Sequence, residues 1–371
     1  MKKVIILSKI PSPYRVPLFE KIHKSNRINL ICVFFAYSQP NRLWKVDVGN
    51  HSFQEIVLES NQIFYKKLAW PIHFTRGVIN LLRIEKPDVI ITAGYESIGF
   101  WQAFIFAKIK KIRFILWSGA TLEALHIKTG LVNFLRKFII RNSDGIISYG
   151  TRASEMLITY GANPDKIFKA HNTVDTEMIS NQVKQLLNIN ELINRRELNI
   201  LYVGQLIERK GVEQVITALS EIDNEFLKFI IIGDGVQKCY LENLVNKLDL
   251  DNKISFVGYK QYDELIPFYA NANALILPSF EEIWGLVVNE ALAAGLPVIS
   301  SIYAGVTCDL IDDSNGLIID PYDIESIKNS IKKIVKLKNE FINKRFQIME
   351  EINKKAGLDQ YVETIINAIN H

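Results

Sequence analysis

Four charged residues in this chain have the types and the spacing to do chemistry, and two of them are carboxylates. Glu282 and Glu290 stand eight positions apart in PSFEEIWGLVVNEALAAGLPVISS, residues 278–301. If a helix begins near Gly285, Glu282 lies in the loop ahead of it and Glu290 lies little more than one turn inside. Both carboxylates can then face the same crevice, at the N-terminal end of this helix. Ionised carboxylates only accept hydrogen bonds, so we expect them to bind hydroxyl groups rather than phosphate.

The two cations lie upstream, in LYVGQLIERKGVEQVITAL, residues 201–219. This pattern predicts a strand, a turn at Gly204, and then a helix that Arg209 and Lys210 immediately precede. Arg can grip phosphate oxygens in a bidentate fork, and Lys acts as a point charge. A ligand with phosphates in the middle and hydroxyl groups at both ends would suit both the cations and the carboxylates. A nucleotide sugar is such a ligand. The alternative is that the glutamates are ordinary acids of a helix N-terminus and the cations are solvated surface charges.

Short apolar runs that alternate with helical patterns must position these residues. The runs are KKVIILS, NLICVFF, PDVIITAG, RFILWSG, DGIISYG and KIFKAHN, then NILYVGQ, LKFIIIGDG, KISFVGY, NALILPS, LPVISS and NGLIID. Such β-branched runs suit strands buried on both faces of parallel sheets, and their alternation with helices gives right-handed βαβ units. The prediction is therefore an α/β chain of two tandem Rossmann-like, doubly wound domains, with the ligand in the crevice at the carboxyl ends of the strands.

The expected domain ranges follow from this pattern. With 371 residues, the chain is long enough for two domains with separate cores. We expect an acceptor-binding domain over 1–180 and a nucleotide-sugar-binding domain over 196–356, joined by a polar connector. A C-terminal helix of about 357–371 is expected to pack back on the first domain.

Cysteine usage and hydropathy bear on the compartment. Three cysteines without C-x-x-C spacing predict neither a disulfide framework nor a zinc site, and they fit a reducing compartment. The initial apolar run VIIL is too short for a signal peptide, and no run reaches the roughly 18 apolar residues of a membrane-spanning helix. We therefore expect a cytoplasmic protein.

The charge is divided unequally along the chain. Residues 1–175 carry 25 Lys and Arg against 12 Asp and Glu, a net of +13, whereas residues 176–371 carry 19 against 28, a net of −9. In the basic half, two helical stretches interleave cations with apolar residues, namely Lys108, Lys110, Lys111, Lys128, Arg136, Lys137 and Arg141. Such helices can lie on an anionic membrane face, which is the partner we predict. The alternative is an ordinary helix with its basic side in water. No recognised nucleic-acid-binding module is present.

The segments LYVGQLIERKG, FIIIGDG, ISFVGY and LPSFEEIWGLVVNEALAAGLPVI resemble, in order and spacing, the retaining nucleotide-sugar glycosyltransferases of family 4. The first half resembles them more loosely, through PSPYR, GTRASEMLITYGANPDKI and HNTVD. The resemblance implies the GT-B fold, in which two Rossmann-like domains face each other across a cleft. It also implies retention at the anomeric carbon and no metal cofactor.

The resemblance further implies roles for single residues. Glu282 would contact donor-sugar hydroxyls, Glu290 would hold the ribose hydroxyls, and Lys210 with Arg209 would neutralise the leaving diphosphate. Gly258 and Tyr259 would line the base pocket, and backbone N–H groups from Trp284 to Leu286 would meet sugar or phosphate oxygens. The implied catalytic residues are Glu282, Lys210 and Arg209. The implied donor site comprises Gly204, Gln205, Arg209, Lys210, Gly258, Tyr259, Glu282, Trp284, Gly285, Leu286 and Glu290.

The first half is expected to bind the acceptor. In SKIPSPYRVPLFEKI two prolines stiffen the turn after the first strand, and Tyr14 and Arg15 are candidates for an anionic or sugar acceptor. The alternative is a proline-fixed turn with a solvated Arg15. The expected acceptor-binding residues are Ser12, Tyr14, Arg15, Ser118 and Gly119. The sequence departs from the family at Gln205, where Arg is usual, and at Ser118–Gly119, where many members have His.

The predicted function is transfer of a hexosyl or N-acetylhexosaminyl residue from a nucleoside-diphosphate sugar, with UDP favoured over GDP. The expected acceptor is a lipid-linked glycan or a surface polysaccharide of O-antigen, capsule or lipopolysaccharide type, reached from the inner face of the membrane. The alternatives are a GT-B-like sugar-nucleotide epimerase and a non-catalytic nucleotide-sugar-binding protein. Two other patterns are weak evidence for a binding site. IIGDG lacks the third glycine of a dinucleotide site, and Asp249-Leu-Asp251 is interpreted as a turn rather than a metal site.

Overall fold

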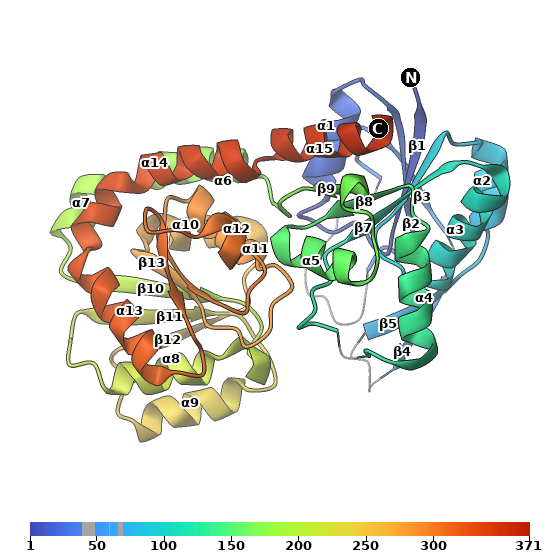
Figure 1. The fold of residues 1–371 in the computed structure, drawn as a ribbon. Helices are drawn as coiled ribbons and strands as arrows, with labels where there is room; N and C mark the ends of the chain where they lie inside the picture. The colour runs from blue at the N-terminus through green and yellow to red at the C-terminus, as the bar shows by residue number, and fades with distance from the viewer. Residues whose placement is uncertain (39–48, 59, 66–69, 126) are drawn as a thin grey trace. The chain divides into compact units, whose positions relative to one another are not determined.

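The computed structural model describes residues 1–38, 49–58, 60–65, 70–125 and 127–371. The chain divides into two compact units, which are drawn in Figure 1. The first unit comprises Met1–Val174 and Leu358–His371, and the second comprises Asp175–Gly357. Each unit is built on a parallel sheet with helices, so the predicted α/β class with two Rossmann-like domains is confirmed.

The first unit contains a seven-stranded parallel sheet in the order β3-β2-β1-β6-β7-β8-β9. Its strands are β1 (Lys3–Ser8), β2 (Asn29–Phe34), β3 (Gln54–Val57), β6 (Val89–Thr92), β7 (Arg113–Ser118), β8 (Gly145–Ser148) and β9 (Ile167–Lys169). A separate antiparallel hairpin is formed by β4 (Ser60–Tyr65) and β5 (Trp70–Thr75). The strand order reverses between β1 and β6, the point at which doubly wound sheets bind ligands.

Two helical layers cover this sheet. The helices of the unit are α1 (Val16–Lys24), α2 (Val78–Glu85), α3 (Ile98–Lys110), α4 (Gly130–Arg141), α5 (Thr151–Thr159), the 3₁₀ turn η2 (Pro164–Lys166) and α15 (Leu358–Asn370). Apolar residues of α2 to α5 form the core on one face, and those of α1 and α15 form the core on the other. Figure 1 shows α1 and α15, from opposite ends of the chain, side by side. Hydrogen bonds fix α15 there, for example from Trp117 Nε1 to the Tyr361 hydroxyl at 2.7 Å.

The second unit contains a six-stranded parallel sheet in the order β12-β11-β10-β13-β14-β15. Its strands are β10 (Leu198–Val203), β11 (Leu227–Ile232), β12 (Ile254–Gly258), β13 (Ala274–Leu277), β14 (Val298–Ser301) and β15 (Gly316–Ile319). The order reverses between β10 and β13, so the loops that follow these two strands lie side by side. These are the loops in which the sequence places Arg209, Lys210 and Glu282, and Glu290 follows in the helix after the second loop.

The helices of the second unit are α6 (Thr176–Leu186), α7 (Ile189–Asn194), the 3₁₀ turn η3 (Glu208–Lys210), α8 (Val212–Ser220), α9 (Lys238–Lys247), α10 (Tyr262–Asn271), α11 (Leu286–Ala293), α12 (Thr307–Leu310), α13 (Ile324–Lys336) and α14 (Lys338–Ala356). Residues 181–195, the connector left outside the two predicted domain ranges, form the end of α6 and all of α7 and belong to this unit. Asp175 caps α6 by accepting a hydrogen bond from Met178 N, at 2.9 Å. Ser180 Oγ then joins α6 to α11 through the carbonyl of Ala293, at 2.8 Å.

All twelve apolar runs of the sequence form strands of the two sheets. The pattern did not predict β3, β4 and β5. The edge strand β3 is four residues long and its side chains are exposed or half-buried, so it lacks the continuous apolar run of a buried strand. Asp249 lies in the turn between α9 and β12 with φ of 54°, as its interpretation as a turn residue requires.

Candidate functional site

Lys210 and Glu282 form an ion pair at the switch point of the second sheet. Lys210 ends η3, which follows β10, and Glu282 lies in the loop after the neighbouring strand β13. Their side chains are 13% and 16% exposed, so the pair is partly shielded from water. Arg209 Nη1 donates to the carbonyl of Glu281 at 3.0 Å, and the carbonyl of Arg209 accepts from Phe280 N at 2.9 Å. The structure thus brings the three implied catalytic residues together in two joined loops.

Two glycines shape these loops, and the first of them allows the loops to approach closely. Gly211, directly after Lys210, has φ of 67°, and a Cβ atom there would lie 2.1 Å from the carbonyl oxygen of Pro278. Gly285 immediately precedes α11 and has φ of 106°, where a side chain would be strained. Backbone therefore packs directly on backbone between the loop that carries the cations and the loop that carries Glu282.

Glu290 has partners of its own, one turn inside α11. The hydroxyl of Tyr269, on α10, donates to Glu290 Oε2 at 2.6 Å. Burial raises the pKa of Glu290 to about 7, and the hydrogen bond from Tyr269 opposes that rise. Tyr262, also on α10, has its pKa raised by burial and next by the charge of Glu290. Neither tyrosine was predicted, because Tyr269 precedes Glu290 by 21 residues and no local spacing relates them.

Gly204, Gly258 and Tyr259 lie where the strands β10 and β12 end. Gly233, in the loop after β11, donates its N–H to the carbonyl of Gly258 at 3.0 Å. A Cβ atom on Gly233 would lie 1.8 Å from the carbonyl oxygen of Gly204. The loops after β10, β11 and β12 are therefore in backbone contact, and Tyr259 lies beside them with 40% of its surface exposed.

The remaining residues of the predicted donor site divide between exposed and buried positions. Gln205 has an exposed side chain, while its carbonyl accepts from the hydroxyl of Tyr202 at 2.7 Å. The indole of Trp284 is buried and donates through Nε1 to Asn289 Oδ1 at 2.9 Å. Trp284 therefore anchors the loop with its side chain, and any contact with a ligand falls to the backbone. Leu286 is the first residue of α11.

In the first unit, Arg15 is packed against aromatic rings. The turn before it is closed by the carbonyl of Ser12, which accepts from Arg15 N at 2.8 Å. The guanidinium lies 4.5 Å from the ring of Trp117 and 5.8 Å from that of Tyr14, and it donates to the hydroxyl of Tyr149. The alternative of a solvated Arg15 is wrong, because cation–π contacts and a hydrogen bond hold it over the end of the sheet.

Ser118 and Gly119 lie beneath the same tyrosine. A Cβ atom on Gly119 would lie 2.0 Å from the Tyr149 ring, so only glycine fits there. Ser118 is buried at the end of β7 and pairs with Ser148 on β8. The predicted acceptor residues thus lie at the carboxyl ends of β1 and β7, beside Tyr149 at the carboxyl end of β8. Tyr149 contacts both Arg15 and Gly119. It was not predicted, although its position at the end of the run DGIISYG indicated a place at the same edge of the sheet.

One residue of the predicted basic surface is not on the surface. Arg136 is buried, with Nε donating to the hydroxyl of Tyr95 at 3.0 Å and Nη1 donating to the carbonyl of Ile127 at 2.8 Å. The prediction is wrong here because these buried acceptors hold the guanidinium inside. Lys108 pairs with Asp144 at 2.7 Å and so is partly neutralised.

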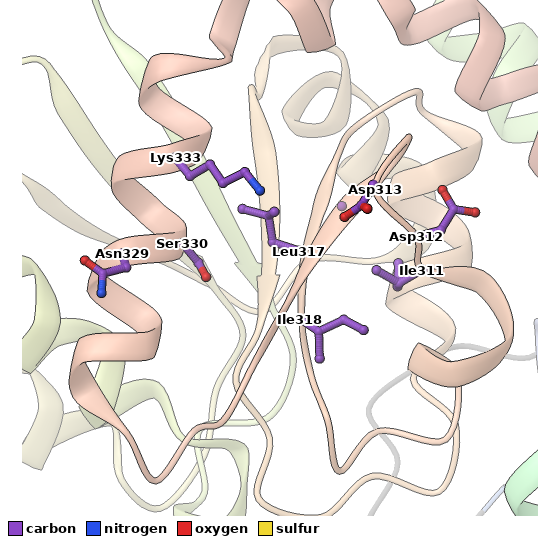
Figure 2. Close-up of a pocket in the computed structure, with 9 residues that line it drawn as sticks. Ile311, Asp312, Asp313, Leu317, Ile318, Asn329, Ser330 and Lys333 are labelled. Carbon is purple, nitrogen blue, oxygen red and sulfur yellow. The ribbon is translucent and has the colours of Figure 1, made fainter.

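A hollow of about 380 Å³ lies apart from all of these residues, between β15 and α13 (Figure 2). Figure 2 shows Lys333 reaching from α13 toward β15, and Asp312 and Asp313 on the loop ahead of that strand. Asp312 accepts a hydrogen bond from Ser314 N at 2.9 Å, which is ordinary turn chemistry. No residue of the predicted site lines this hollow.

Two family models match the chain. The model of the glycosyltransferases of family 4 matches residues 33–178, and that of the group 1 glycosyl transferases matches residues 183–355. Together they span most of the sequence, and the chain belongs to the family 4 glycosyltransferases. The resemblance seen in the sequence is thereby confirmed.

Similar proteins agree with this assignment. The uncharacterized glycosyltransferase MJ1607 of Methanocaldococcus jannaschii is 34% identical over 38% of this chain and 36% of its own length. The lipopolysaccharide core biosynthesis glycosyltransferase LpsE of Rhizobium meliloti is 30% identical over 37% and 39%. The chain thus aligns with less than two fifths of either relative. The crystal structure of Anabaena HepE in complex with UDP has a TM-score of 0.78 at 16% identity and covers 100% of this chain and 99% of its own, so it shares the GT-B fold.

Among the described residues, no helix has the length and apolarity to cross a bilayer. In the same part of the chain, no three side chains of His, Cys, Asp or Glu gather as a metal site would require. Metal independence stays a prediction.

Proposed function

We propose that this protein is a retaining glycosyltransferase that moves a hexosyl or N-acetylhexosaminyl residue from a nucleoside-diphosphate sugar to a lipid-linked glycan or surface-polysaccharide acceptor. The observation that carries the proposal is the Lys210–Glu282 ion pair at the switch point of the second sheet. This is where open α/β sheets bind their ligands. The pair combines a cation for a leaving diphosphate with a carboxylate for sugar hydroxyls.

In the proposed reaction, the bond between the anomeric carbon and the diphosphate oxygen breaks, and the acceptor hydroxyl oxygen bonds to that carbon on the same face. The hydroxyl proton passes to the departing diphosphate oxygen. Negative charge grows on the leaving diphosphate, and Lys210 and Arg209 neutralise it without a metal ion. Glu282 accepts hydrogen bonds from the sugar and holds the ammonium of Lys210 in place. Glu290, once ionised, accepts hydrogen bonds from the ribose hydroxyls.

The donor and acceptor classes rest on the site residues and on similar proteins. We favour UDP over GDP, and the UDP bound to the HepE structure supports this choice. The name of the Rhizobium relative supports an acceptor of the lipopolysaccharide type. We place acceptor binding at the Arg15–Tyr149 cluster of the first unit, where a guanidinium and a tyrosine hydroxyl can meet an anionic or sugar group.

The first test is thermal unfolding of the purified protein with saturating UDP, GDP, ADP, CMP or NAD. A ligand at 100 times its dissociation constant adds about 2.7 kcal/mol to the free energy of unfolding. A shift with UDP alone supports the proposed donor and selects the sugar nucleotides for a transfer assay. Turnover of a sugar nucleotide without acceptor would indicate an epimerase, and binding without transfer would indicate a binding protein. A shift with NAD alone, or with no compound, would refute the donor site.

We also propose that the protein is cytoplasmic and binds the inner face of the membrane through the first unit. Here α4 exposes an apolar stripe, with Leu131 71% and Phe134 62% exposed, and Phe134 stacks on the exposed ring of Phe138. Exposed cations flank this stripe at Lys128 and Arg141. An apolar helical face beside basic residues suits a bilayer surface that carries anionic lipids.

Flotation with phosphatidylcholine vesicles, with and without phosphatidylglycerol, tests this association. The variant Phe134→Ser should weaken binding to the anionic vesicles, because it removes buried apolar area from the contact. Phe346→Ser is the matched control, since Phe346 is a comparably exposed phenylalanine on α14 of the second unit. Equal binding by both variants and the wild type would refute a role for α4.

A further inference from the structure

A second basic feature of the first unit lies away from every residue discussed as donor or acceptor site. It is a pocket of about 580 Å³, within the range of small-molecule sites. Its lining includes Lys108, Lys111, Arg113, Asp144, Lys166 and His371.

The topology separates this pocket from the acceptor cluster. Arg113 begins β7, Asp144 immediately precedes β8, and Lys166 immediately precedes β9. The pocket therefore lies at the amino ends of these strands, whereas Ser118 and Gly119 follow the carboxyl end of β7. In a parallel sheet these are opposite edges, so the pocket is not a part of the proposed acceptor site.

The charges in this pocket are not balanced from within the protein. Lys108 pairs with Asp144, whose other oxygen accepts from Phe114 N at 2.8 Å. In the part of the chain that the structure describes, the Arg113 guanidinium donates to one acceptor, the carbonyl of Ala368, at 2.9 Å from Nη2. Within the described residues, no ion pair or side-chain hydrogen bond involves the ammonium groups of Lys111 and Lys166. Four cationic side chains of the lining therefore face one carboxylate, that of Asp144.

The surroundings of the pocket indicate the kind of anion. Lys108 shares one face of α3 with Ile105 and Ile109, at the spacings i, i+3 and i+4. Both isoleucines are exposed, to 52% and 72%. Cations that can hold phosphate oxygens thus lie directly beside apolar side chains that face solvent. A soluble anion would use the cations alone, whereas a phospholipid would use both.

We propose that this pocket binds the phosphate group of an anionic phospholipid headgroup, while the exposed isoleucines of α3 contact the acyl region. The inference deepens the proposed membrane association by naming a headgroup site. It is independent of the sugar that is transferred.

The test compares two double variants that each remove two positive charges from the first unit. Lys111→Gln with Lys166→Gln changes the pocket, and Lys86→Gln with Lys110→Gln changes exposed lysines outside its lining. Generic attraction to an anionic surface is worth about fivefold in binding per charge. Removing two such charges costs about 25-fold by diffuse attraction alone, which is the most that the control should lose. Two direct hydrogen bonds from ammonium groups to a phosphate are worth more, so a headgroup site predicts a loss of about 150-fold or more for the pocket variant on phosphatidylglycerol vesicles. Both variants should keep wild-type unfolding temperatures and transfer rates in detergent.

The remaining outcomes are distinct. Equal losses for the two variants would overturn the pocket and leave only diffuse attraction, with membrane association intact. Wild-type protein that ignores the vesicles, but is stabilised by inorganic phosphate unless Lys111 and Lys166 are replaced, would overturn the lipid and identify a soluble phosphate ligand. Failure in both assays would overturn the site itself, and none of these results depends on whether the protein transfers a sugar.

Discussion

Replacing Lys210 by methionine tests the proposed chemistry most directly. Methionine keeps an unbranched apolar stem of similar length, so the packing around a side chain that is only 13% exposed is largely retained. What is lost is the positive charge opposite Glu282. If that charge neutralises the leaving diphosphate, the loss should appear in the transition state and in binding of the nucleotide product.

The expected magnitudes for catalysis and for folding differ. Removing one preorganised group that stabilises transition-state charge costs about 2–4 kcal/mol, or roughly 30- to 900-fold in kcat/KM. The free energy of unfolding should fall by about 1–3 kcal/mol, because Glu282 stays partly buried without its partner. That range lies between the worth of an exposed ion pair and the cost of breaking a buried one.

The assays are kcat/KM for the sugar nucleotide, urea unfolding, and calorimetric binding of UDP and of uridine. Lys210→Met should weaken binding of UDP and leave binding of uridine unchanged, since uridine has no phosphate. The double variant with Glu282→Gln removes both charges and should recover most of the lost stability. Recovery of transfer by this double variant, or an unchanged kcat/KM in Lys210→Met, would refute the assignment of Lys210 to the diphosphate.

Two further predictions concern residues that shape the same site. Burial raises the pKa of Glu290 from 4.5 to about 7. Between these two pH values the folded protein holds a proton that the unfolded chain releases. The contribution of Glu290 to the free energy of unfolding therefore falls by about 3 kcal/mol as the pH rises through this window. The donor KM should fall over the upper part of the same window as the carboxylate ionises, and Glu290→Gln should flatten both profiles. Gly211→Ala should destabilise by more than the roughly 1–2 kcal/mol of left-handed strain, because its Cβ would meet the carbonyl of Pro278 at 2.1 Å. Gly130→Ala, with φ of 70° and nothing within 4 Å of the added Cβ, is the matched control, and equal unfolding energies for the two variants would contradict the close approach.

The strands and loops could be predicted from the sequence because the residue types that favour them occur together within short segments. Continuous β-branched runs of buried parallel strands predicted twelve strands, and glycines that follow six of them marked loops. The ion pair between Lys210 and Glu282 spans 72 residues, yet it could be anticipated, because both follow strands that the doubly wound order makes neighbours.

Contacts between helices were not predictable in the same way. Periodicity indicates which face of a helix is buried, but it does not indicate what that face meets. The buried guanidinium of Arg136 was read as a surface charge for this reason, and the hydrogen bond between Tyr269 and Glu290 was missed. A basic residue in an apolar helix can turn inward whenever buried carbonyl and hydroxyl groups accept its N–H groups, and those acceptors come from other elements.

Arg345 shows how such contacts extend the site beyond the switch point. It lies on α14, in a region that the sequence marks only as a long charged helix, and is 1% exposed. Its guanidinium donates to the carbonyls of Tyr269, at 2.8 Å, and of Ala294, at 3.0 Å, which lie at the C-terminal ends of α10 and α11. A cation at two helix C-termini offsets both dipoles and fixes the helices to each other. The 2.6 Å hydrogen bond between Tyr269 and Glu290 joins those same two helices. The carboxylate that we propose to bind ribose, that of Glu290, is therefore positioned by an arginine 55 residues further along the chain.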